Sequence, residues 1–148
     1  MSKAFTDEEA PVPDDDALPP RHGRFPITPA GYARLQRELA TLSHVAPGEN
    51  GARRARALVQ ILESVDVVEP KLDDGRVGFG ARVTIEDDAG HQTAYELVGP
   101  DEIEPAVRRI SIASPVGQAL RGKRVGERAV LRRPRGDVEV TVVAVDAT

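Results

Sequence analysis

The sequence predicts an α+β protein, in which a short antiparallel helical hairpin is followed by an antiparallel sheet with one helix. Three observations support this fold class. Apolar residues in the first half recur at spacings of three and four, as in amphipathic helices. The second half alternates apolar and polar residues between turns that contain glycine, which is typical of strands joined as hairpins. A single Ser-Pro helix start interrupts these strands, so helix and strands belong to one unit.

The composition limits the classes of function. With 148 residues and 40% hydrophobic content, the chain suits one ordinary domain, or a small domain with an appendage. No apolar run reaches the roughly 18 residues that a membrane span needs, and the N-terminus does not resemble a signal peptide. Cysteine is absent, which fits a reducing compartment, so we expect a cytoplasmic protein without membrane contact. The net charge of −4 argues against broad non-specific binding to nucleic acid.

Residues 1–25 are predicted to form a disordered acidic tail. The segment holds six acids and four prolines, so it can bury little apolar surface in a core. Such charge runs are usually solvated, but the same composition suits an acidic arm that touches a basic partner surface.

Residues 26–69 are predicted to form the helical hairpin. Thr28 is a suitable N-cap and Pro29 a suitable first helical residue, so a helix of about four turns begins there. A loop follows over residues 44–51, because they contain proline and glycine. The second helix is expected at residues 52–64, and its first turns are basic, with Arg53, Arg54 and Arg56.

Residues 75–148 are predicted to form the sheet. The clearest strand is residues 77–85, where apolar side chains occupy alternate positions. A hairpin turn over residues 87–90 returns the chain into a second strand, residues 92–98. Further strands are predicted at residues 110–112, 128–133 and 138–145, and a weaker one at residues 65–68.

The most informative stretch is residues 111–127, between two of these strands. Ser114 can accept a hydrogen bond as an N-cap, and Pro115 suits the first helical position. Gly122 suits the left-handed conformation that ends a helix. The stretch therefore predicts a short helix that packs across the sheet through Val116, Ala119 and Leu120.

Recognisable catalytic chemistry is absent from the sequence. No glycine-rich phosphate loop precedes a helix, the three histidines lack metal-ligand spacing, and no serine has a histidine nearby to activate it. We therefore predict no catalytic residue, no metal site and no cofactor, and we expect that the chain is not an enzyme.

Four segments carry a resemblance to a known family: residues 27–35 (ITPAGYARL), 75–83 (GRVGFGARV), 95–102 (YELVGPDE) and 110–127. Together they resemble the GreA/GreB family of bacterial transcript-cleavage factors, as a paralogue with a short hairpin in the manner of Rnk. The resemblance implies a shortened coiled-coil hairpin joined to an FKBP-like C-terminal domain.

The resemblance also implies a partner. In the family, the globular domain docks on RNA polymerase near the secondary channel, and acids at the hairpin tip hold a magnesium ion at the polymerase active site. It implies docking through Ser111, Ala113, Ser114 and Pro115, with Ala113 at a position where the family has Asp or Asn. Binding as a monomer, with indirect contact to nucleic acid, is expected.

The hairpin tip departs from the family pattern. Compared with the hairpin of the family that the sequence resembles, this hairpin is shorter by roughly 30 residues, or about 20 Å of reach. The tip offers Glu49 and Asn50, followed by Arg53 and Arg54. One carboxylate beside arginines is a poor magnesium site, because the local field repels a cation. We therefore expect an RNA polymerase-binding regulator of elongation without transcript-cleavage activity.

Three alternatives stay open. The chain could be a weak cleavage factor that uses Glu49. The FKBP-like domain could be a peptidyl-prolyl isomerase, although three Phe and two Tyr offer little for the aromatic pocket that this chemistry needs. It could also bind DNA or another protein through a basic face that includes Arg121, Lys123 and Arg124.

Overall fold

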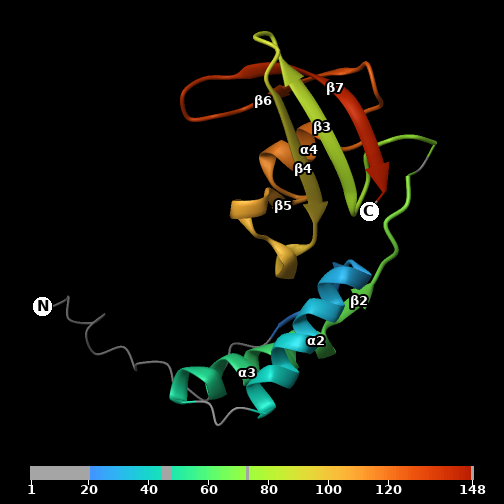
Figure 1. Ribbon diagram of the computed structural model, residues 1–148. Coiled ribbons are helices and arrows are strands. Elements are labelled where there is room, and N and C mark those ends of the chain that lie inside the picture. The colour runs from blue at the N-terminus through green and yellow to red at the C-terminus, as the bar shows by residue number, and fades with distance from the viewer. Residues whose placement is uncertain (1–20, 45–47, 73, 148) are drawn as a thin grey trace, which may run out of the picture.

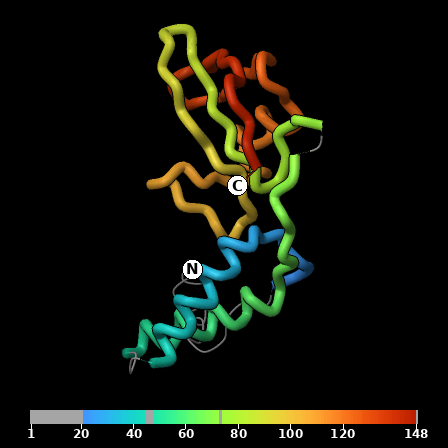
Figure 2. The backbone as a smooth tube through the Cα atoms, turned by 45° about the vertical axis from the view of Figure 1, so that its right-hand side comes forward, coloured from blue at the N-terminus to red at the C-terminus, as the bar shows by residue number. Residues whose placement is uncertain are grey.

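The protein is described by a computed structural model that covers residues 21–44, 48–72 and 74–147. A helical hairpin forms one part and a curled sheet the other, and the two parts meet at one end of each (Figures 1 and 2). Most of the predicted acidic tail, and the middle of the predicted hairpin loop, lie outside the described residues. Among the described helices, none is both long and apolar enough to span a membrane.

The hairpin consists of helices α2 (Pro29–His44) and α3 (Glu49–Glu63), which run antiparallel (Figure 1). The predicted start of the first helix is confirmed, because the amide of Gly31 donates to the hydroxyl oxygen of Thr28 at 3.0 Å. Leu35 and Leu58 are buried between the helices. The apolar stripes predicted from the sequence therefore face each other.

Helix α3 begins three residues before its predicted start. Glu49 and Asn50, expected in the tip loop, form its first turn, and Gly48 is the extended N-cap. The prediction missed this because Gly51 resembled a loop residue. An acid in the first turn favours the helix through the macrodipole, which offsets the propensity cost of that glycine.

Two short strands lie at the base of the hairpin. Strands β1 (Phe25–Ile27) and β2 (Val65–Val67) pair in parallel, and the amide of Phe25 also donates to the carbonyl of Ser64 at 3.0 Å. Ile27 and Val65 are buried with the hairpin core. This pairing holds together the two ends of the helical hairpin.

The sheet has the order β5-β4-β3-β7-β6. Its members are β3 (Ala81–Asp87), β4 (Gln92–Val98), β5 (Arg109–Ser111), β6 (Arg128–Leu131) and β7 (Val138–Ala147). The α+β fold class is confirmed, but the sheet is mixed, because β5 runs parallel to β4. The division of the chain into an acidic tail (residues 1–25), a hairpin (26–69) and an FKBP-like domain (75–148) stays a prediction.

The first long strand starts four residues later than predicted. Gly80 takes a positive φ of 78°, which interrupts the alternation before β3. Val77 instead exchanges backbone hydrogen bonds with the turn after helix α4 (Pro115–Leu120), donating to Lys123 and accepting from Gly122. Helix α4 covers one face of the sheet, and its Leu120 is fully buried in the core with Val83, Leu97, Leu131 and Val142.

Candidate functional site

The predicted docking segment, residues 111–115, forms a tight turn between β5 and α4. The hydroxyl oxygen of Ser111 accepts from the amide of Ala113 at 3.1 Å, and the amide of Ser114 donates to the carbonyl of Ser111 at 2.9 Å. Ser114 caps α4 by accepting from the amide of Gly117 at 3.0 Å. These bonds hold the backbone while Ala113 and Pro115 stay exposed. The turn is therefore a rigid, solvent-facing surface.

Gly117 lets α4 lie directly against this turn. A Cβ added there would lie 2.6 Å from the carbonyl oxygen of Ile112 and closer still to that of Ser111. Both obstacles are backbone atoms, so no side-chain rotation could relieve the clash. The docking segment and the helix behind it therefore form one packed unit.

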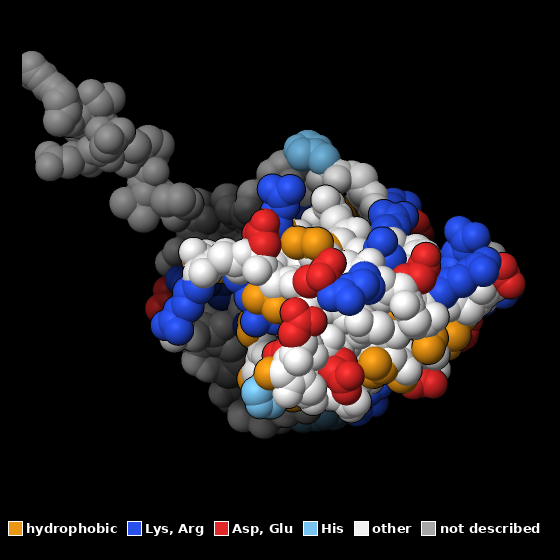
Figure 3. All heavy atoms as spheres, turned by 90° about the horizontal axis from the view of Figure 1, so that it is seen from above, with side chains coloured by type: hydrophobic (Ala, Val, Ile, Leu, Met, Phe, Trp, Pro, Cys, Tyr) orange, Lys and Arg blue, Asp and Glu red, His pale blue; other side chains and the backbone are white. Residues whose placement is uncertain are grey.

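The predicted basic face follows immediately after α4. Arg121 and Arg124 are exposed, and Lys123 is half-buried. Arg124 is paired with Asp74 at 2.5 Å, whereas Arg121 and Lys123 have no carboxylate partner within the described ranges. Seen from above, the molecule carries acidic and basic side chains interspersed rather than one large basic patch (Figure 3). This face offers two cations at the C-terminal end of α4, whereas the docking segment lies at its N-terminal end.

The hairpin tip lies at the end of the helical hairpin that points away from the sheet (Figure 1). Glu49 and Asn50 are exposed, and Arg53 is half-buried. Arg54 turns toward α2 and binds Glu38 through two hydrogen bonds of 2.7 and 2.9 Å. The hydrogen bond from Arg54 lowers the pKa of the Glu38 carboxyl from its usual value. Within residues 21–44, 48–72 and 74–147, no three potential metal ligands come together.

The structure also reveals a contact between hairpin and sheet that sequence reasoning missed. Glu102, in the single turn η1 (Pro100–Glu102), is buried, with 1% of its side chain exposed. It accepts from the amide of Thr28 at 2.9 Å and from the Thr28 hydroxyl, and Arg34 lies 3.5 Å away. The carboxylate thus sits at the N-terminus of α2, where the helix dipole favours an anion.

Residues next to Glu102 also contribute to the contact between the hairpin and the sheet. Asp101 forms a bidentate pair with Arg21, at 2.8 and 2.6 Å, and that guanidinium lies over the ring of Phe25. Gly99 approaches the carbonyl oxygen of Pro26 so closely that no Cβ would fit. A polar cleft of about 210 Å³ opens beside the contact, but each acid on its wall is paired with an arginine.

Sequence reasoning missed this contact because residues 99–109 resemble an exposed polar loop. Much of the loop is indeed exposed, including the second single turn η2 (Pro105–Val107). Only its partner 74 positions earlier in the chain distinguishes Glu102 from the neighbouring acids. The one signal in the sequence was that Glu102 is the last residue of segment 95–102, one of the four segments that carry the family resemblance.

Comparison with known proteins gives consistent matches. Residues 72–147 match the family described as "Transcription elongation factor, GreA/GreB, C-term". Transcription elongation factor GreB of Pseudomonas aeruginosa is 37% identical over 158 residues, covering 86% of this chain and 94% of the relative. Transcription elongation factor GreA of Solidesulfovibrio magneticus is also 37% identical, covering 82% and 92%.

A solved structure, GreA factor homolog 1 (Gfh1) of Thermus thermophilus, is 28% identical and covers 84% of this chain and 99% of its own. Its TM-score is 0.45, so the family assignment rests on the sequence matches. The relatives contradict the expectation that the chain is not an enzyme. They are named GreA and GreB, as is the family of transcript-cleavage factors that the sequence resembles. The absence of a catalytic motif from the sequence was therefore not enough to exclude a role in transcript cleavage.

Proposed function

The chain belongs to the GreA/GreB family of transcription elongation factors, and from that premise we propose that it binds RNA polymerase through its C-terminal sheet and regulates elongation. One observation carries the proposal. The family match over residues 72–147 contains the turn at residues 111–115, which is rigid and exposed. A preformed surface binds with a smaller entropy cost than a mobile one.

The surroundings of the turn suit an acidic partner surface. Arg121 and Lys123 follow the turn by six and eight residues, at the other end of α4, and neither is neutralised by a carboxylate among the described residues. Charges of this kind chiefly steer association and set its dependence on salt. We also propose that the chain binds RNA polymerase as a monomer. The same cations would then bring it into indirect contact with nucleic acid.

The hairpin supports a regulatory role more than a strong effect on transcript cleavage. Helix α2 has 16 residues, so the hairpin extends only about 24 Å. The alignment with the Pseudomonas relative spans 158 positions, more than this whole chain, so the relative has segments that this chain lacks. Glu49 is the sole acid in the first turn of α3. It is also the sole acid among residues 45–50 of the sequence, which form the tip. Magnesium is usually held by more than one hard oxygen ligand, so this tip suits the metal poorly.

Replacing Pro115 by alanine tests the docking surface. We expect Pro115→Ala to weaken binding to core RNA polymerase about five-fold, or ~1 kcal/mol, because it removes an exposed contact and loosens the helix start. The dissociation constant would be measured with purified protein and polymerase. The matched control is Pro134→Ala, an exposed proline in the turn between β6 and β7, which should bind like the unmodified chain. Equal affinity of both variants would refute docking through residues 111–115.

Replacing Glu49 by alanine tests the hairpin tip in the same complexes. We expect Glu49→Ala to change the dissociation constant by less than about two-fold, because an exposed charge contributes little. Cleavage by backtracked polymerase should be weakly stimulated by the unmodified chain. Glu63→Ala, which removes an exposed acid at the other end of α3, is the control. Strong magnesium-dependent cleavage that only Glu49→Ala abolishes would show that one carboxylate suffices.

A further inference from the structure

The five-stranded sheet has an open edge at β6. The strand order ends with β6 on one side and with β5 on the other. The β5 edge is covered in part, because Glu104 and Arg109 exchange two backbone hydrogen bonds of 2.9 and 3.1 Å. No described residue pairs with β6 on the side away from β7. An edge of this kind presents unpaired amides and carbonyls to solvent, so it can accept a further strand.

The register between β6 and β7 shows which backbone groups face this edge. The amide of Val142 donates to the carbonyl of Glu127 at 2.9 Å. Hydrogen-bonded and non-hydrogen-bonded positions alternate along an antiparallel ladder, so Arg128 and Val130 occupy non-hydrogen-bonded positions. Their amides and carbonyls therefore point away from β7. The edge offers a donor and an acceptor from each of these two residues, in the spacing that an added strand requires.

The side chains of β6 divide between the two faces of the sheet. Ala129 and Leu131 are buried in the core, where Leu120 of α4 also lies. Arg128 and Val130 point to the opposite face, and Val130 is 49% exposed although it is apolar. Successive side chains of a strand point to opposite faces, so an added strand would alternate in the same way. We expect it to place apolar side chains on the α4 face and polar ones on the face of Arg128.

Three arginines at the end of β6 select the charge of the partner. Arg132, Arg133 and Arg135 are exposed, and none of them pairs with a carboxylate in the part of the chain that the structure describes. Asp137 is the one acid of the same turn, so the turn stays basic. Two antiparallel copies of β6 would bring Arg128 of each opposite Arg132 of the other, and like charges in opposed positions destabilise a pair of strands. The charges therefore disfavour a second copy of β6 and favour an acidic strand.

From these observations we propose that the open edge of β6 binds an extended acidic peptide of a partner protein, as a sixth strand antiparallel to β6. An antiparallel strand begins opposite the end of β6, so carboxylates in its first residues would lie beside the three arginines. A hollow of about 440 Å³, lined by residues 133–138, lies at the same end and would receive one of these side chains. In this mode of recognition, backbone hydrogen bonds provide affinity and side chains provide selectivity.

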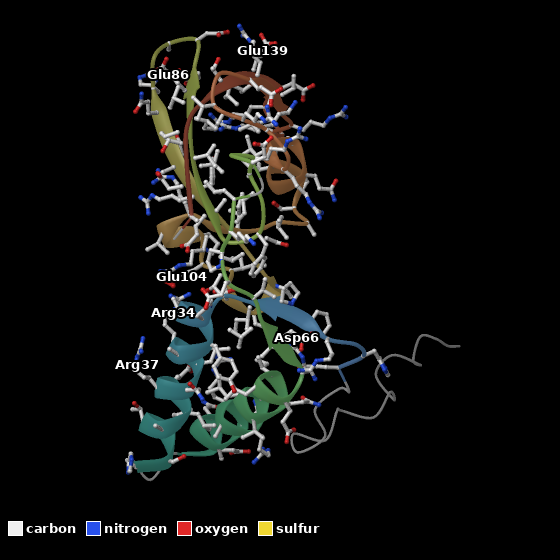
Figure 4. All side chains as sticks on the ribbon, turned by 90° about the vertical axis from the view of Figure 1, so that its right-hand side faces the viewer. Arg34, Arg37, Asp66, Glu86, Glu104 and Glu139 are labelled. Carbon is white, nitrogen blue, oxygen red and sulfur yellow. The ribbon has the colours of Figure 1, made fainter. Side chains whose placement is uncertain are left out.

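The β6 edge is remote from the helical hairpin and from the docking segment. Glu139 of β7 lies opposite Val130 and pairs with Arg128. In Figure 4 this residue lies at the far end of the molecule from Arg34 and Arg37 of α2. The docking segment follows β5, which forms the other edge of the sheet. A peptide on β6 would therefore leave the docking segment free, and the proposal can fail or hold independently of polymerase binding.

The test uses the full chain and a synthetic peptide of about seven residues with blocked ends, in which two glutamates precede alternating valine and threonine. At saturation we expect hydrogen exchange of the Arg128 and Val130 amides to slow at least about ten-fold, because both become hydrogen-bonded. Val130→Pro removes one outward amide without removing a bond to β7, and it should weaken binding at least about ten-fold. The matched control, Val130→Thr, keeps the amide and should bind within about two-fold of the unmodified chain.

The charges are tested by a second variant, R132E/R133E/R135E, which keeps every amide of β6 and so also serves if Val130→Pro does not fold. It should weaken binding at least about ten-fold, because three attractions become repulsions. A peptide with lysine in place of each glutamate should not bind the unmodified chain.

Four results would overturn the proposal. The first is peptide binding that leaves exchange of the Arg128 and Val130 amides unchanged, and the second is equal binding by Val130→Pro and Val130→Thr. The third is protection of these amides that rises with protein concentration without peptide, which would assign the edge to a second copy. The fourth is tighter binding of a single-stranded RNA oligonucleotide than of the peptide through the three arginines, which would assign the turn to nucleic acid.

Discussion

Gly117→Ala is expected to damage both stability and polymerase binding, despite being a conservative change in a helix. The added Cβ would lie 2.6 Å from the carbonyl oxygen of Ile112, so α4 must move away from the docking turn. Overpacking costs about 1–3 kcal/mol, and because two backbone oxygens lie this close we expect the upper part of that range, about 2–3 kcal/mol. Alanine regains roughly 1 kcal/mol over glycine in a helix. We expect a net fall of about 1–2 kcal/mol in the free energy of unfolding, or roughly 2–8 °C in Tm.

The movement should also alter the exposed surface. Ser114 caps α4 through the amide of Gly117 itself, so a displaced helix loses this bond. We expect binding of Gly117→Ala to RNA polymerase to be weaker than that of Pro115→Ala. Thermal unfolding followed by circular dichroism, and the dissociation constant, would be measured on the same sample.

Gly78→Ala is the matched control for this variant. Its Cβ would meet nothing closer than 3.7 Å, and Gly78 does not need a positive φ. This control should unfold and bind like the unmodified chain. If Gly117→Ala matched the control in both measurements, α4 would not be packed against residues 111–115 as described.

Glu102→Ala is expected to separate the hairpin from the sheet. The change leaves the amide and hydroxyl of Thr28 without their acceptor and Arg34 without its carboxylate. Hydrogen bonds to a buried charged group contribute roughly 1.5–3 kcal/mol each, so we expect a loss of about 3 kcal/mol or more. Small-angle X-ray scattering should show a larger radius of gyration, and the amide of Thr28 should exchange faster with solvent.

Two variants control for this effect. Glu104→Ala removes a neighbouring acid that is half-exposed and pairs with Arg109 at 3.0 Å, so it should cost less than about 1 kcal/mol. Glu102→Gln keeps one acceptor for Thr28 and should fall between the two. Unchanged scattering and unchanged amide exchange in Glu102→Ala would show that the Glu102 contact does not hold the two parts together.

Much of the fold could be predicted from the sequence because its signals are local. The turn between β3 and β4 is one example: Asp87 accepts from the amides of Ala89 and His91 at 2.9 Å, and Gly90 takes a positive φ of 86°. The hydrogen bond from the backbone of His91 lowers the pKa of Asp87 from its usual value. All of these partners lie within four residues, so the residue types alone indicated the turn.

The candidate site was predictable to a smaller extent. The sequence and its resemblance indicated the segment at residues 111–115, which forms a hydrogen-bonded turn with Ala113 and Pro115 exposed. Its docking role stays a proposal. The tip was less well predicted, since α3 begins at Glu49 and Arg54 binds Glu38 across the hairpin. Such a cross-helix pair depends on how the two helices rotate against each other, which periodicity does not specify.

The sequence by itself determined where α2 and α4 start, because Thr28 and Ser114 cap these helices through amides only three residues ahead. Only the tertiary structure decided that β5 runs parallel to β4, that β1 pairs with β2, and that Glu102 is buried rather than solvated. The physical reason is the separation of the partners. A cap needs one turn of chain, whereas the carboxylate of Glu102 is satisfied by a helix end 74 residues away, which exists only after both parts have folded and met.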